Sequence, residues 1–172
     1  MKPKDIKWDL LKKGTKQIKP FDATPKKIGK LMNVLLNEHL HLSDEYRYPV
    51  FVRTMLHDLL SSKSGLHISY DVDGFGGLLV FRNIRPGFKA SLMFVLLDKS
   101  CVKPSIIKET RALIKRVMKE FKLKRLEAMT ADERIVRLAK MLGFKGEGIQ
   151  KNGFMLDGIL MKNNPLSIVR GG

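Results

Sequence analysis

Apolar residues change their spacing along this chain in an order that leaves few folds open. Residues 25–40 and 48–60 carry apolar side chains three and four positions apart, which predicts two amphipathic helices. From residue 67 the apolar positions alternate instead, in short runs separated by Gly-rich and Pro-containing turns. This pattern predicts three consecutive strands, at residues 67–72, 78–81 and 90–97.

The second half of the chain alternates between the two spacings. A helix is predicted over residues 105–121, a strand over 124–129, a helix over 132–142 and a strand over 154–161. Strands that alternate with helices require a crossover, so the sheet should be mixed. The predicted fold class is therefore α+β, built as layers, with a mixed central sheet flanked by helices in the order ααβββαβαβ.

The 172 residues are enough for one ordinary domain. Residues 1–24 are predicted to form a basic N-terminal arm, because their basic and apolar positions follow no sustained period. Thr24 can cap a helix and Pro25 is tolerated at its first position, so the domain should begin there and extend over residues 25–162. Residues 163–172 are left as a C-terminal tail.

The chain is strongly basic. It has 33 Lys and Arg residues against 17 Asp and Glu, a net charge of +16, which favours nucleic acid or an acidic protein surface as a partner. A lone cysteine, Cys101, fits a reducing compartment. The apolar runs are far shorter than the roughly 20 residues of a membrane span. We therefore expect a soluble, cytoplasmic protein.

One motif resembles a known family. After the predicted helix over residues 132–142 the chain reads Leu142-Gly143-Phe144, followed by Glu147-Gly148. This LGFxxEG pattern, together with the order of elements over residues 25–162, resembles the GNAT family, the Gcn5-related N-acetyltransferases. The resemblance implies a GNAT-like sheet in which the strands at 90–97 and 124–129 splay apart to hold acetyl-CoA.

The resemblance also implies where acetyl-CoA would bind. Family members carry Arg/Gln-x-x-Gly-x-Gly/Ala before the long helix, where backbone amides hold the pyrophosphate. The matching window here is residues 107–112, in which Thr110 stands in place of a Gly and only Ala112 agrees. The candidate acyl-CoA positions are Lys108, Thr110, Arg111, Ala112 and Asp132.

The catalytic residues of the family are mostly replaced. The position of the Tyr that protonates the leaving thiolate is Ala139, which has no proton to give. For the general base, Asp98 at the end of a predicted strand is the nearest carboxylate. More distant alternatives are Glu45, Asp71 and Asp73. By this pattern the chain is a degenerate family member, and its catalytic residue is not identified.

Basic residues follow one side of the predicted long helix, opposite its apolar side. They are Lys108, Arg111, Lys115, Lys119 and Lys122. Such a stripe can bind nucleic acid or another anion, and it is also the ordinary solvated face of a helix. A metal site is not predicted, because His39 and His41 are two positions apart and have no Cys partner.

Two functions follow from these observations. The first is a noncatalytic binding or assembly component with a basic surface, similar in overall character to phage head-assembly and internal virion proteins. Its partners would be phage structural proteins, and its location the virion. The alternative is an acetyl-CoA-dependent N-acetyltransferase that acts on an amine of a protein, a small molecule or an aminoacyl-tRNA.

Overall fold

The computed structural model describes residues 11, 13–37, 67–130, 133–156 and 159–169. Its helices are α2 (Pro25–Asn37), the short 3₁₀ helix η3 (Lys99–Cys101), α4 (Pro104–Glu120) and α5 (Glu133–Met141). Its strands are β1 (Ile18–Pro20), β2 (Ile68–Val72), β3 (Gly77–Arg85), β4 (Lys89–Leu96), β5 (Arg125–Thr130), β6 (Lys145–Gly146), β7 (Gln150–Leu156) and β8 (Ile159–Val169). None of the described helices is long and apolar enough to span a membrane.

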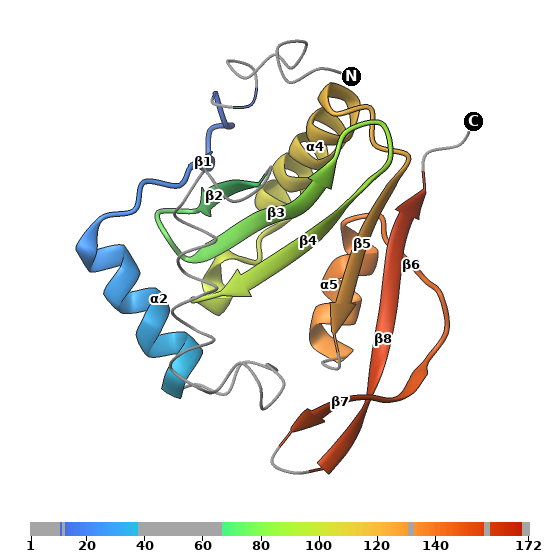
Figure 1. The fold of residues 1–172 in the computed structure, drawn as a ribbon. Helices are drawn as coiled ribbons and strands as arrows, with labels where there is room; N and C mark the ends of the chain where they lie inside the picture. The colour runs from blue at the N-terminus through green and yellow to red at the C-terminus, as the bar shows by residue number, and fades with distance from the viewer. Residues whose placement is uncertain (1–10, 12, 38–66, 131–132, 157–158, 170–172) are drawn as a thin grey trace.

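The strands form one mixed sheet in the order β1-β2-β3-β4-β5-β8-β6, with β7 paired to β8 (Figure 1). All neighbouring pairs are antiparallel except β4 and β5, which are parallel. The helix α4 connects these two parallel strands, as a crossover connection requires. The predicted α+β class with a mixed central sheet is confirmed.

The helices α4 and α5 cover one face of the sheet and lie behind it in Figure 1. Leu113 and Val117 of α4 and Leu138 of α5 share a single apolar cluster with Leu79 and Phe81 of β3. The side chains that alternate with Leu79 and Phe81 on β3 are also buried, so both faces of this strand are covered. The sheet is therefore the middle layer of the core.

The motif after α5 ends that helix as its residues predict. Gly143 has a φ of 100°, a conformation that glycine adopts without strain, and its N–H donates to the carbonyl of Lys140. The N–H of Phe144 donates to the carbonyl of Ala139, and the Phe144 ring is buried against the core. The Leu-Gly-Phe sequence therefore stops the helix and fixes the chain for β6.

The described part of the predicted N-terminal arm belongs to the domain. Ile18 in β1 is fully buried, and β1 pairs with β2 along its length. Glu109 of α4 accepts a hydrogen bond from the backbone N–H of Gln17, at 2.9 Å, and Arg116 donates to the carbonyl of Gly14, at 3.1 Å. Residues 13–20 therefore form a strap held along α4 and the sheet edge, which corrects the boundary expected at residue 25.

The C-terminal prediction also needs correction. The predicted strand over residues 154–161 covers the end of β7 and the start of β8, which are two antiparallel strands. β8 continues to Val169 and pairs with β5, from Thr130↔Asn164 to Arg125↔Val169. Leu166 is 2% exposed. Residues 163–169 are thus an interior strand of the sheet and not a tail.

The remaining predicted elements agree with the structure to within a few residues. The helices starting at residues 25, 105 and 132 correspond to α2, α4 and α5, and the predicted strands before residue 130 correspond to β2, β3, β4 and β5. The strands β1 and β6 were not predicted, because each has only two or three residues. The helix predicted over residues 48–60 lies outside the described residues.

Candidate functional site

The parallel strands β4 and β5 pair only where each begins. Their ladder consists of Lys89↔Arg125, Ala90↔Leu126 and Ser91↔Glu127. Farther along, β4 remains paired with β3 and β5 with β8, so the two strands diverge towards their C-terminal ends (Figure 1). In the described residues, residues 92–96 of β4 and 128–130 of β5 therefore do not pair with each other. The backbone N–H and C=O groups on these two facing edges have no partner strand in this part of the chain. Such edges can bind a ligand that carries amide groups.

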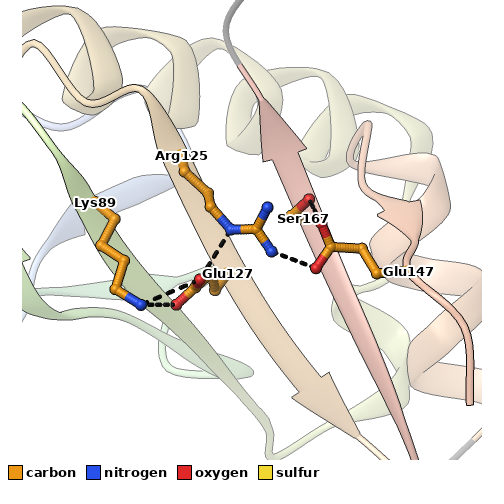
Figure 2. Close-up of polar contacts among 5 residues, drawn as sticks. All are labelled: Lys89, Arg125, Glu127, Glu147 and Ser167. Carbon is orange, nitrogen blue, oxygen red and sulfur yellow. Dashed lines mark hydrogen bonds and ion pairs between the residues drawn. The ribbon is translucent and has the colours of Figure 1, made fainter. Parts of the chain in front are cut away.

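A polar network joins the strands at the end where they are still adjacent (Figure 2). Lys89 of β4 lies 3.0 Å from a carboxylate oxygen of Glu127 on β5, and the Arg125 Nε lies 2.8 Å from the other. Arg125 also pairs with Glu147, which accepts a 2.7 Å hydrogen bond from the Ser167 hydroxyl on β8. We call these five residues the closed-end network.

The network is held in its ionised form. Partial burial raises the pKa of Glu127, but hydrogen bonds from Lys89 and Arg125 outweigh this effect and leave that pKa below its usual value. The Ser167 hydroxyl and Arg125 lower the pKa of Glu147. Because Glu127 is already paired with two cations, it is a poor proton acceptor at neutral pH. The network ties β4, β5 and β8 together at the point from which β4 and β5 diverge.

None of the closed-end residues was predicted as functional. Lys89, Arg125 and Glu127 lie among apolar residues along β4 and β5, which in the sequence is the ordinary pattern of a half-exposed strand. The parallel register, which places Lys89 opposite Arg125, brings these charges together. The sequence signal was Glu147 of the LGFxxEG motif, which pairs with Arg125.

The start of α4 lies at the other end of the divergent strands, because residues 97–103 lead directly from β4 to it. Lys103 precedes the helix and makes no side-chain capping hydrogen bond, and Pro104 has no N–H. The N–H of Ile107 donates to the carbonyl of Lys103. Ser105 and Ile106 therefore carry the first-turn N–H groups that have no acceptor inside the helix, an arrangement that favours an anion.

The predicted pyrophosphate window lies too far along the chain. Lys108, Thr110, Arg111 and Ala112 are in the second and third turns of α4, where backbone N–H groups are used within the helix. Thr110 is 2% exposed, and the Nε of Arg111 donates to the carbonyl of Met141 at the end of α5. The helix start at residues 103–106 is the part of α4 that can present amides to phosphate. Asp132 lies outside the described residues.

A small apolar pocket lies between β4, the start of α4 and α5. It is lined by Phe94, Cys101, Val102, Ile106, Ile107, Thr110, Leu138 and Leu142. Cys101 donates from its thiol to the carbonyl of Gly76, and burial raises its pKa to about 11. This thiol is therefore protonated at neutral pH and is a packing group rather than a nucleophile.

Asp98 and Ala139, two of the positions considered for acid–base chemistry, do not form a catalytic pair. Asp98 is exposed and accepts a 2.8 Å hydrogen bond from the backbone N–H of Ser100, which lowers the Asp98 pKa. It thereby stabilises the start of η3, at the open end of the divergent strands. Ala139 of α5 is buried in the core of the protein, and its methyl side chain has no proton to donate. Among the described residues, no three potential metal-ligating side chains lie together.

The predicted basic stripe is present on the outer side of α4. Lys108, Lys115, Lys119 and Lys122 are exposed, and the apolar side of the helix faces the sheet. Arg111 is also exposed but is directed to the end of α5 by its hydrogen bond to Met141. These are the positions in which a helix packed on a sheet exposes its side chains to solvent.

The sequence matches no established protein-family profile and no curated protein. Solved structures with the same fold are nevertheless numerous. One is an acetyl transferase from Salmonella typhimurium that modifies the N-terminal serine of the 50S ribosomal subunit protein L7/L12. It is 20% identical, with a TM-score of 0.69 over 91% of this chain and 97% of that chain.

Two further structures were determined with coenzyme A compounds. Spermidine N-acetyltransferase from Vibrio cholerae, in complex with CoA and spermine, is 14% identical, with a TM-score of 0.63 over 90% of this chain and 96% of that chain. The microcin C7 self-immunity acetyltransferase, in complex with acetyl-CoA and AMP, is 15% identical, with a TM-score of 0.65 over 91% and 94%. At such identities the similarity shows the fold alone. The chain has the fold of N-acetyltransferases, as its resemblance to the GNAT family implies.

Proposed function

We propose that this protein is an acyl-CoA-dependent N-acetyltransferase that acetylates a primary amine. The observation that carries the proposal is the divergence of β4 and β5 after only three paired residues, with the first turn of α4 at the open end. Structures of the same fold bind CoA or acetyl-CoA. Their similarity supports a catalytic function more than a purely structural one.

The residues that would hold acetyl-CoA follow from the geometry. The free edges of β4 and β5 would pair with the amide groups of the pantetheine chain. The N–H groups of Ser105 and Ile106 would bind the pyrophosphate at the positive end of the α4 dipole. Lys103 adjoins this turn, although its ammonium is paired with Asp73 at 2.9 Å. These residues fit the cofactor without the glycine-rich sequence of the family.

When bound, acetyl-CoA supplies the thioester whose acetyl group is transferred. The amine nitrogen forms an N–C bond as the C–S bond breaks, the amine loses one proton and the thiolate gains one. Backbone N–H groups on the free edge of β4 would stabilise negative charge on the carbonyl oxygen. Since Ala139 replaces the usual proton donor, the thiolate would take its proton from solvent.

The charge of the protein restricts the acceptor. A net charge of +16 repels polycations such as polyamines and attracts an amine that is carried on an anionic molecule. We therefore expect the acceptor to be the amine of a protein or of another anionic molecule.

The first test is calorimetric titration with acetyl-CoA, using two variants of Ser105. We expect micromolar affinity for the wild type. Ser105→Glu places a carboxylate in the first turn, where it stabilises the helix but repels phosphate, so affinity should fall roughly tenfold or more. Ser105→Gln has a similar size and no charge, and should bind within about threefold of the wild type. Absence of heat from the wild type at millimolar acetyl-CoA, or unchanged affinity in Ser105→Glu, would contradict the proposal.

A second candidate function is noncatalytic binding in the same fold. It is favoured by Ala139, a buried position at which this chain lacks the proton donor that the GNAT resemblance implies for an active member. Release of free thiol from acetyl-CoA in the presence of amine-bearing peptides separates the two functions. Binding of acetyl-CoA without any amine-dependent thiol release would favour the noncatalytic function.

A further inference from the structure

We propose that the outer surface of the helical layer binds the phosphate backbone of a nucleic-acid duplex. We call this surface the basic face. It is formed by the exposed residues Lys13, Lys16, Lys108, Lys115, Lys119 and Lys140. They come from the strap, from α4 and from α5, three segments that are far apart in the sequence.

Contacts on both sides of α4 make the basic face continuous. On one side, Glu109 binds the hydroxyl of Thr15 and the N–H of Gln17, which places Lys16 of the strap beside α4. On the other side, Arg111 donates to the carbonyl of Met141, the residue after Lys140. The lysines of α4 therefore lie between basic residues of both neighbouring segments.

Acidic side chains do not neutralise this surface. The described residues of α4 and α5 include three carboxylates, Glu109, Glu120 and Glu133. Glu109 is occupied by the strap, while Glu120 and Glu133 are at the last position of α4 and the first of α5. Some basic residues elsewhere are paired, as Lys27 is with Asp71 at 2.7 Å and Lys89 with Glu127. Other exposed basic residues, such as Lys26 and Arg85, lie on α2 and β3, away from the helical layer. The basic face is distinguished by the number of exposed lysines that lie on adjacent segments.

The shape of the basic face favours a polymer. Lys108 and Lys119 are 11 residues apart, or about 16 Å along a helix at 1.5 Å per residue. A duplex carries one negative charge per about 1.7 Å of its axis, so a row of this length can contact several phosphates at once. A single small anion would use only one end of the row.

The side chains of the basic face favour a nucleic-acid backbone over a protein. Protein interfaces depend on apolar or aromatic anchors, and stacking on unpaired bases requires exposed aromatic residues. Of the described large apolar side chains on α4 and α5, only Met141 is exposed, at 42%, and it lies at the edge of the face. No aromatic ring of these helices is exposed in the described residues. The surface therefore offers charge alone, which suits sequence-independent duplex binding.

Most of the basic face is separate from the proposed acetyl-CoA site, although Lys108 lies about one turn from the start of α4. Lys115 and Lys119 are 11 and 15 residues beyond Pro104, so they lie about 16 and 22 Å along α4 from its start. Phosphates bound at the first turn would not reach them. The inference therefore does not depend on the proposed function.

The test is fluorescence anisotropy with labelled 20-base-pair DNA and RNA duplexes, titrated at several salt concentrations between 50 and 200 mM. The test variant combines Lys115→Gln, Lys119→Gln and Lys140→Gln. Each lost phosphate contact lowers the slope of log K against log salt by about 0.9, so the slope should fall by about 2 to 3 and the affinity at 100 mM salt roughly tenfold or more. The matched control combines Lys26→Gln, Arg82→Gln and Arg85→Gln, which removes the same charge from α2 and β3.

We expect the control to bind duplexes within about threefold of the wild type and both variants to keep the wild-type melting temperature. Three results would overturn the proposal: no duplex binding by the wild type at 50 mM salt, an equal loss in the control, or binding to polyglutamate as tight as to a duplex of equal charge. The last result would assign the face to an acidic protein. A difference between the DNA and RNA arms would identify which duplex is preferred and would support the proposal in either case.

Discussion

Three polar side chains of α4 hold neighbouring segments in place. Glu109 and Arg116 bind the strap, and Arg111 binds the end of α5. Each forms a hydrogen bond with a backbone group of the neighbouring segment, and the bonds of Glu109 and Arg116 are partly buried. These residues are therefore structural, and the lysines between them remain available for ligands.

Tyr70 gives a prediction at the same scale. Its buried hydroxyl donates to the carbonyl of Leu11 at 2.9 Å, and burial raises its pKa from 10.0 to about 12. Between pH 10 and pH 12 the unfolded chain loses this proton while the folded protein keeps it, so the free energy of unfolding should fall as pH rises. Urea unfolding should show a fall larger by about 2 kcal/mol in the wild type than in Tyr70→Phe. Equal falls in both proteins would show that Tyr70 is not buried.

At the scale of elements, helices and strands that carry a full apolar period could be predicted from the sequence. α4 was predicted because its buried residues recur every three or four positions. This spacing identifies a helix without any knowledge of the strands that the helix packs on. The β7–β8 hairpin was missed although Asp157-Gly158 stands between its two strands in the sequence, a dipeptide typical of a two-residue hairpin turn. The extension of β8 past Pro165 was harder to predict, because proline is rare inside an interior strand. In the structure Pro165 pairs with Met129, and its carbonyl accepts from the N–H of Glu147. Such strands form because they pair with segments that are far apart in the sequence, and the spacing of apolar residues gives no information about that pairing.

Leu166 tests whether the C-terminal residues form a strand of the core. Leu166→Ala removes a side chain that is 2% exposed, and should lower the free energy of unfolding by about 2 to 4 kcal/mol in urea titration. Val169→Ala, in the same strand but 63% exposed, should change it by about 0.5 kcal/mol or less. If Leu166→Ala were as mild as Val169→Ala, residues 163–169 would be the tail that the sequence suggests.

At the scale of the whole molecule, the candidate site depends on register rather than on residue type. The sequence allowed the fold to be predicted, but the closed-end network was missed. This network depends on the register of β4 and β5, which brings together residues such as Lys89 and Glu127 that are 38 positions apart. The residues predicted to bind pyrophosphate lie in the second and third turns of α4. The excess of basic residues was evident in the composition, whereas the basic face could be seen only once the strap and α5 were placed beside α4.

The central claim is that the divergent edges of β4 and β5 and the first turn of α4 form an acetyl-CoA site. Amide hydrogen exchange of the intact protein, with and without saturating acetyl-CoA, tests it most directly. We predict slower exchange of amides within residues 92–96 and 128–130 and at Ser105 and Ile106. Amides of the outer turns of α4, from Lys115 to Lys119, should be unchanged. Unchanged exchange at residues 92–96 and 105–106, or protection confined to other segments, would contradict the account.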